Sequence, residues 1–288
     1  YDQMVNQIAC LRFPGKAFFR TNSNEANLFG LEPHFGCCTA NFNQAWPKLA
    51  MNVFFASKKG VVCALMLPAE LETKIGNARV KLCTVTEYPF RLSCQYLVTV
   101  DRPVSFELKI RLPQWTKSVR VNGEEVAARW YYTVHKHWVG TESITVELED
   151  TPRLVPRPRG LKTVEYGALV YALPIKTEYK MLEYEKDGVE RKFPYCDYEL
   201  LPRSEWRYGF ASEAFAVCRH NGDSVPFLSK NPRVSLKASL CRIRWDYADG
   251  YENIAENTPV SKTAVGPREE CELIPYGCAK LRMTEMPM

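Results

Sequence analysis

The chain has 288 residues, enough for about two domains of ordinary size, and 46% of its residues are hydrophobic and 25% are charged. No apolar run approaches the roughly 20 residues that a membrane-spanning helix requires, so no membrane segment is expected. The net charge of +5 is spread along the chain without a clustered basic stretch, which argues against nucleic acid as a partner.

Residues 1–10 have neither an initiator methionine nor a basic region followed by an apolar core, so they do not read as a signal peptide. We therefore expect the chain to begin inside a larger protein. Eleven cysteines, several of them within strand-like segments, favour reduced thiols over a disulfide framework. This cysteine usage predicts a reducing compartment, the cytoplasm.

Residues 1–59 differ in character from the rest of the chain. Apolar residues recur at near-helical spacing over residues 4–11 and again over residues 42–54, which predicts helices. Pro47 is expected to divide the second stretch into a short turn of helix and a longer helix that ends near Ser57, because proline lacks an amide hydrogen and clashes with the preceding turn.

From Gly60 the pattern changes to short apolar runs at intervals of roughly ten residues, which predicts a β-sandwich over residues 60–175. Asn122-Gly123 is expected to form a tight hairpin turn, because both residues tolerate positive φ. A second β module is expected over residues 176–288. The main expected strands cover residues 61–67, 80–86, 91–100, 105–112, 118–121, 143–148, 164–173, 234–245 and 271–284.

The sharpest local feature is Cys37-Cys38, two adjacent cysteines directly before an expected helix. The partial positive charge at a helix N-terminus favours thiolates, and a thiolate can act as a nucleophile or bind zinc. A tetrahedral zinc site needs further ligands from elsewhere in the chain. The alternative interpretation is a pair of small buried hydrophobic residues at a helix start.

The run from Asn27 to Lys48 contains the stretch His-Phe-Gly-Cys-Cys-Thr-Ala-Asn and resembles the Cys-Cys-x-x-Asn region of β-L-arabinofuranosidase-type (family 127-like) glycoside hydrolases. Later segments resemble the β part of that family in the same order, so the chain is similar to its C-terminal portion over nearly the whole length. These segments are Arg111–Thr116, Val121–Glu124, Glu165–Tyr171 and Leu273–Arg282.

The resemblance implies a mainly β fold with an α-helical N-terminal segment. Residues 1–59 would be the tail of an (α/α)6 catalytic barrel, the six-hairpin glycosidase fold, and β-sandwich domains would follow. It also implies a retaining hydrolysis of β-L-arabinofuranosides or related sugars, in which Cys37 attacks the anomeric carbon. Cys37 and Cys38 would bind zinc together with a Glu and a Glu-x-Cys motif.

In the family the Glu ligand, the Glu-x-Cys motif and the acid/base Glu all lie upstream of the cysteine pair, before the start of this chain. The zinc site is therefore expected to be incomplete, and the fragment is expected to be inactive alone. The expected partners are a carbohydrate substrate, namely an arabinose-containing glycan or oligosaccharide, and a second copy of the chain in a homodimer.

Other tempting features have structural interpretations. Glu269-Glu270-Cys271 is interpreted as a coincidence beside a terminal strand, and His135 and His137 as strand residues rather than metal ligands. Core packing is favoured over sugar stacking for three tryptophans, Trp115, Trp130 and Trp138. Two rival hypotheses stay open: a non-catalytic β-sandwich structural or carbohydrate-binding module, and a degenerate relative that keeps the fold without the chemistry.

Overall fold

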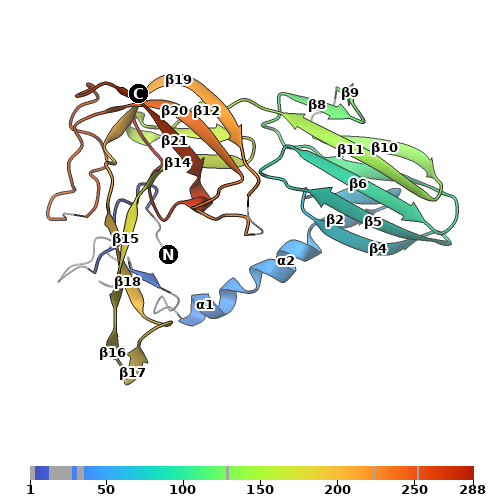
Figure 1. The fold of residues 1–288 in the computed structure, drawn as a ribbon. Helices are drawn as coiled ribbons and strands as arrows, with labels where there is room; N and C mark the ends of the chain where they lie inside the picture. Colours follow the sequence, from blue (N-terminus) through green and yellow to red (C-terminus); the bar gives the residue numbers. More distant parts are fainter. Residues whose placement is uncertain (1–3, 13–27, 31–35, 128–129, 223–224, 252) are drawn as a thin grey trace. The chain divides into compact units, whose positions relative to one another are not determined.

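The computed structural model describes residues 4–12, 28–30, 36–127, 130–222, 225–251 and 253–288 (Figure 1). The chain forms two compact units, one of residues 41–151 and the other of residues 1–40 and 152–288. Strands dominate both units, as the sequence predicts. The α-helices of the described part are α1 (Gly36–Phe42) and α2 (Ala45–Met51), and neither is long or apolar enough to cross a bilayer.

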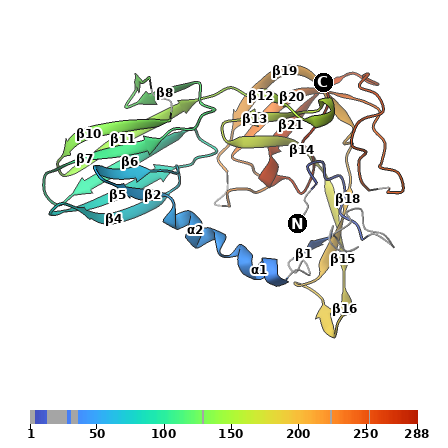
Figure 2. The same cartoon turned by 180° about the vertical axis from the view of Figure 1, so that it is seen from behind.

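The unit of residues 41–151 is a β-sandwich. Its strands are β2 (Phe54–Ser57), β3 (Gly60–Cys63), β4 (Ala69–Ile75), β5 (Ala78–Thr86), β6 (Ser93–Val100), β7 (Val104–Arg111), β8 (Ser118–Val121), β9 (Glu124–Glu125), β10 (Tyr131–Trp138) and β11 (Thr141–Glu149). One sheet has the order β10-β7-β3-β2, and the other has the order β4-β5-β6-β11-β8-β9 (Figure 2). Buried residues of both sheets form one common core, which confirms the predicted sandwich for this part of the chain.

Trp138 lies fully buried in this core at the end of β10. Its ring stacks on Phe106 of β7 with 5.3 Å between ring centroids, and its Nε1 donates a hydrogen bond to the Phe106 carbonyl oxygen at 3.1 Å. Core packing is thus confirmed for Trp138, whereas Trp130 is 61% exposed. The predicted hairpin turn is also present, with φ values of 50° at Asn122 and 84° at Gly123.

The expected helix up to Ser57 is wrong at its end. Helix α2 stops at Met51, and Phe54–Ser57 instead forms strand β2, which pairs with β3 in a hairpin. Two adjacent phenylalanines suit a strand, and the hairpin satisfies backbone groups that a longer helix would have paired internally. Pro47 lies in the first turn of α2, where its missing amide hydrogen has no intrahelical acceptor to lose.

The expected helix over residues 4–11 is also wrong. Residues 4–12 form no helix, and isolated antiparallel bridges join Gln7 to Arg282 and Cys10 to Leu200. These bridges join the segment to strands that are distant in sequence. Such pairing overrides a helical pattern that rests on only three apolar residues. Neither α1 nor α2 identifies an (α/α)6 barrel, so the barrel tail stays a prediction.

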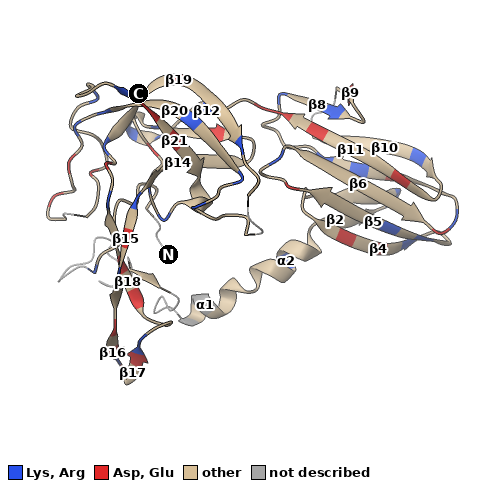
Figure 3. Cartoon of the chain, in the orientation of Figure 1, with Lys and Arg blue, Asp and Glu red and all other residues tan. Residues whose placement is uncertain are grey.

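The second unit contains two 3₁₀ turns (Pro158–Gly160 and Tyr276–Cys278) and many strands. The strands are β1 (Phe29–Gly30), β12 (Arg153–Pro156), β13 (Lys162–Tyr166), β14 (Leu169–Ile175), β15 (Thr177–Leu182), β16 (Tyr184–Lys186), β17 (Val189–Arg191), β18 (Asp197–Pro202), β19 (Tyr208–Arg219), β20 (Val234–Arg242), β21 (Arg268–Pro275) and β22 (Leu281–Met283). The main sheet has the order β12-β13-β14-β21-β20-β19, with β22 beside β14, and a smaller sheet has the order β1-β18-β15. Charged residues of both signs are interspersed along the strands (Figure 3).

The segment 152–175 lies in a different unit from the one that the sequence pattern predicts. It was expected to close the first sandwich, but β14 pairs with β21 and with β22, and β13 pairs with β12 and β14. The reason is that strand periodicity shows where a strand runs and which face is buried, while the choice of partner depends on residues about a hundred positions away.

Candidate functional site

The predicted nucleophile, Cys37, lies in the first turn of α1, and its side chain is exposed. Cys38 follows in the same turn, but its side chain lies outside the described part of the structure. The helix begins at Gly36, slightly earlier than the sequence pattern suggests, so the pair lies within the helix rather than before it. An exposed Cys37 does not support the interpretation of this residue as a buried hydrophobic side chain.

The described residues do not complete a zinc site. Tetrahedral zinc needs four ligands, and the adjacent cysteines can supply two of them. Within the described ranges no three His, Cys, Asp or Glu side chains come together in a way that could hold a metal ion. Glu25 and Glu32, which are close to the pair in sequence, lie outside the described residues.

The other metal-like motifs have structural partners. Glu270 on β21 forms an ion pair with Lys237 at 2.9 Å, within the ladder between β20 and β21. His135 Nδ1 lies 3.3 Å from a Glu107 carboxylate oxygen, and His137 Nδ1 lies 2.8 Å from the Ser105 hydroxyl. These contacts agree with the structural interpretation of both motifs.

A cleft of about 800 Å³ in the second unit is a separate candidate site. Segments far apart in sequence form its walls, from β14 and β15 to the start of β19, the end of β20, β21 and β22. Its lining residues include two tyrosines, Tyr179 and Tyr208. The charged lining residues are four cations and two carboxylates, namely Lys176, Lys230, Arg242 and Lys280 with Glu205 and Glu272.

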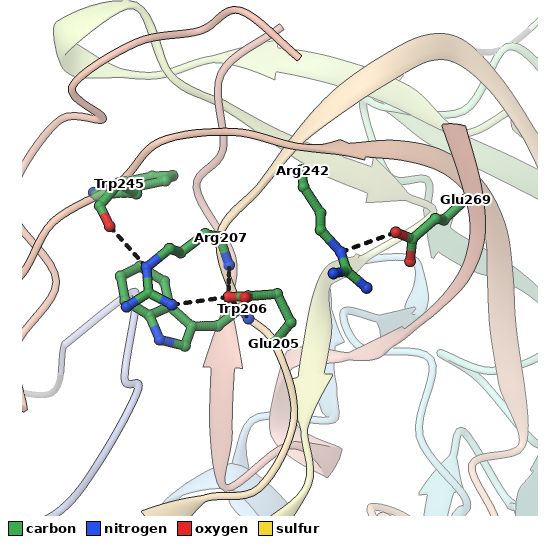
Figure 4. A network of polar contacts seen from close by, with 6 residues as sticks. All are labelled: Glu205, Trp206, Arg207, Arg242, Trp245 and Glu269. Carbon is green, nitrogen blue, oxygen red and sulfur yellow. Dashed lines mark hydrogen bonds and ion pairs between the residues drawn. The ribbon is translucent and has the colours of Figure 1, made fainter. Parts of the chain in front are cut away.

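Arg242 is fixed at the cleft wall by Glu269 (Figure 4), whose carboxylate is also bound by Tyr208. Its Nε lies 3.0 Å from one carboxylate oxygen of Glu269, and the Tyr208 hydroxyl donates a hydrogen bond to the other oxygen at 2.9 Å. Burial raises the pKa of the Tyr208 phenol, so this hydroxyl stays protonated and remains a donor at neutral pH. The arrangement holds the guanidinium in place before any ligand binds.

Glu205 is held by the residues that follow it (Figure 4). Its Oε1 accepts hydrogen bonds from the backbone N–H groups of Trp206 at 2.9 Å and Arg207 at 3.1 Å, and from Arg207 Nη1 at 3.1 Å. Arg207 is itself anchored, because its Nε donates to the Trp245 carbonyl oxygen at 2.9 Å and its guanidinium stacks 4.5 Å above the Trp206 ring. Glu205 therefore presents a fixed carboxylate to the cleft.

Comparison with known protein families gives a match for the sandwich of the first unit. Residues 60–150 match the sequence profile described as the middle domain of GH127 β-L-arabinofuranosidases. This part of the chain is therefore similar to a GH127 middle domain. The sequence resemblance to β-L-arabinofuranosidase-type proteins is thereby confirmed. Cys37 and the cleft of the second unit both lie outside the matched residues.

Solved structures give the same fold for most of the chain. A GH127 β-L-arabinofuranosidase from Geobacillus stearothermophilus T6 is 16% identical and superposes with a TM-score of 0.58 over 88% of this chain and 37% of its own. A protein described only as a glycoside hydrolase is also 16% identical, with a TM-score of 0.55 over 98% of this chain and 44% of its own. A third relative, a GH127 β-arabinofuranosidase, is 16% identical, with a TM-score of 0.51 over 88% of this chain and 39% of its own.

The chain therefore spans about two fifths of the length of these relatives. At such low identity the likeness concerns the fold alone. A comparison with curated proteins gives no match. Sequence reasoning missed the cleft altogether, because Tyr179, Glu205 and Arg242 belong to different strands and connections and form no local motif.

Proposed function

We propose that the chain is part of a glycoside hydrolase that acts on β-L-arabinofuranosides or related sugars with retention of configuration. The match of residues 60–150 to the GH127 middle domain is the observation that supports this proposal. An arabinose-containing glycan or oligosaccharide is the corresponding substrate class. The chain alone is proposed to be inactive, because the described residues do not complete the metal group that the family resemblance implies.

Cys37 is the proposed nucleophile, and its exposed position in the first turn of α1 supports this role. Its thiolate forms a bond to the anomeric carbon while the bond to the leaving oxygen breaks, and an acid protonates that oxygen. Water then cleaves the thioglycosyl bond and returns the thiolate. Two displacements at the same carbon retain its configuration.

A chimera tests the proposed activity. Residues 1–288 replace the structurally matching part of the Geobacillus enzyme, and the release of L-arabinose from an aryl β-L-arabinofuranoside is measured. We expect hydrolysis that is lost in Cys37→Ser and kept in Cys218→Ser, a matched variant at a partly exposed strand cysteine. A folded, monodisperse chimera that hydrolyses the substrate equally well with Cys37→Ser would contradict the assignment of the nucleophile.

Zinc content tests the proposed metal ligands in the isolated chain. Cys37→Ser and Cys38→Ser are compared with the parent chain by elemental analysis and by the rate of iodoacetamide labelling. If the pair contributes to a site that assembles in this chain, stoichiometric zinc is lost in either variant. If the chain binds no zinc, the ligand set is incomplete without other parts of the parent protein, as proposed here.

A non-catalytic carbohydrate-binding module is the second candidate function. The cleft of the second unit favours it, because aromatic and charged side chains converge there outside the GH127 middle domain. The two candidates are compatible, since glycan binding in the cleft does not require hydrolysis at Cys37.

A further inference from the structure

The cleft of the second unit has the size of a small-molecule site. Its volume of about 800 Å³ falls in the range of roughly 300–1,000 Å³ that is typical of ligand pockets. Such sites combine apolar walls with a few fixed polar groups, and here Leu173, Ile175 and Leu281 contribute the apolar part. The ligand class therefore depends on what the polar groups can donate and accept.

Arg242 is a fixed hydrogen-bond donor of the cleft. A guanidinium carries five N–H donors, and the contacts with Glu269 and Tyr208 leave some of them available. About half of the Arg242 side chain (51%) is exposed, so these donors are accessible from solvent. Because the Glu269 contact fixes the planar fork, little further side-chain entropy is lost when a ligand binds.

The acceptor side of the cleft is Glu205. Its Oε1 is saturated by three donors from Trp206 and Arg207, whereas Oε2 accepts no hydrogen bond from any residue in the described part of the chain. A ligand hydroxyl can therefore donate to Oε2 without displacing an existing contact. The carboxylate is oriented for this role by the Arg207 anchor shown in Figure 4.

Tyr179 adds an aromatic surface at the cleft. Its side chain is 49% exposed, and it is braced by edge-to-face contacts with Phe29 and Tyr198, each with 6.2 Å between ring centroids. A braced, half-exposed ring can pack against the apolar C–H face of a sugar at a low entropic cost, because a tyrosine has few rotatable bonds.

We propose that this cleft binds a neutral saccharide unit, with Arg242 donating to ring or hydroxyl oxygens, Glu205 accepting from a hydroxyl, and Tyr179 packing against the sugar ring. A hydroxyl group both donates and accepts, so it complements a wall that presents a cation and a carboxylate together. A simple anion is the rival ligand, because Lys176, Lys230 and Lys280 also line the cleft, and phosphate is therefore one of the probes in the test. This binding deepens the second candidate function, on which it rests, and it does not depend on the proposed hydrolysis.

Calorimetric titration of the full chain carrying Cys37→Ser tests the proposal, since this background separates binding from turnover. The probes are arabinotriose, cellotriose and sodium phosphate, each up to 10 mM (roughly the weak-binding limit of the method). We expect arabinotriose to bind, and we expect the affinity to fall about tenfold or more in Tyr179→Ala and in Arg242→Met. The matched control is Tyr131→Ala, at a 41% exposed tyrosine of the GH127 middle domain, and it should bind as the parent does.

Three outcomes would overturn the saccharide assignment. They are a lack of binding to both saccharides, an affinity that is the same in Tyr179→Ala and the parent, and a response to phosphate alone. Binding of cellotriose with the same dependence on Tyr179 supports a saccharide site of broader specificity. Tyr179→Ala removes a half-exposed ring and is expected to leave the fold intact, which circular dichroism verifies. Failure of the chimera to hydrolyse its substrate leaves this binding result unchanged.

Discussion

Arg282 donates a hydrogen bond from Nη2 to the carbonyl oxygen of Met4 at 2.8 Å, which joins two residues 278 positions apart. Its Nη1 donates to the Lys280 carbonyl oxygen at 2.8 Å, and its guanidinium stacks 4.1 Å from the ring centroid of Tyr276. Arg282 is only 2% exposed. The buried cation thus joins the N-terminal segment to the last strand of the second unit.

Replacement of Arg282 by methionine is expected to destabilise this unit by about 2–4 kcal/mol, because backbone carbonyl oxygens at a buried site lose charged donors. The free energy of unfolding in urea measures the effect. Arg203→Met is the matched control, since the Arg203 side chain is 58% exposed and pairs with Glu178 at the surface, and it should change stability by less than about 0.5 kcal/mol. Equal effects of the two substitutions would show that the Arg282 contacts are not a major source of stability.

The β-sandwich of residues 41–151 offers a matched pair of tryptophans, with Trp138 buried in the core and Trp130 exposed. Trp138→Ala should cost about 3–5 kcal/mol, because it leaves a cavity next to Phe106 and removes the hydrogen bond to the Phe106 carbonyl oxygen. Trp130→Ala should change the free energy of unfolding little, because the Trp130 side chain is 61% exposed. Thermal unfolding of both variants tests the ranking, and a larger loss in Trp130→Ala would contradict the assigned core.

Strands with a strict alternation were predictable from the sequence, and their partners were not. Phe106, Leu108 and Ile110 alternate with charged residues, and β7 lies where this pattern predicts it, with those three side chains buried. Strand β4 was missed, because its alternation of Leu71 and Ile75 with charged residues lacks the bulk of the neighbouring strands. Pairing across the chain is decided by packing of distant residues, which no local window contains.

The candidate sites, like the strand pairing, could be predicted only where a local sequence motif marks them. Cys37-Cys38 could be found because two adjacent cysteines form a local motif, whereas the cleft residues Tyr179, Glu205 and Arg242 are separated by dozens of positions. Each of these three is an ordinary strand or loop residue when its own neighbours are considered. Only the fold brings a fixed cation, a fixed carboxylate and an aromatic ring to one wall.

Helices α1 and α2 carry exposed apolar side chains. Phe42 is 70% exposed, Trp46 67% and Met51 76%. Exposed apolar groups of this size favour association, so the isolated chain should self-associate, in agreement with the predicted homodimer or with a higher oligomer. Trp46→Gln combined with Met51→Gln should shift the sedimentation coefficient toward that of a monomer.

Val139→Gln is the control for this prediction, because Val139 is 53% exposed on the sandwich and lies away from the helices in sequence. Its sedimentation should match that of the parent chain at every concentration. A parent chain that sediments as a clean monomer over the range of roughly 1–100 μM, where weak dimers dissociate, would contradict the predicted association.

Glu205 should make stability depend on pH in the acid range. Burial, the largest single influence, raises its pKa, but the N–H groups of Arg207 and Trp206 and the Arg207 charge outweigh burial and hold the pKa of Glu205 below its ordinary value of 4.5. A carboxyl group whose pKa is lowered on folding contributes stability above the unfolded pKa and loses that contribution as the pH falls through the folded pKa.

The measurement is the free energy of unfolding of the parent and of Glu205→Gln between about pH 7 and pH 3, a range that brackets the ordinary carboxyl pKa. We expect the difference between the two proteins to be largest above about pH 5 and to shrink below pH 4.5, the ordinary pKa of this group. Glu213→Gln, at a side chain that is 64% exposed and pairs with Lys162, should give a small difference throughout. A difference for Glu205→Gln that stays constant across the range would mean that its carboxylate is not held by the Arg207 anchor, and it would also remove the acceptor from the proposed saccharide cleft.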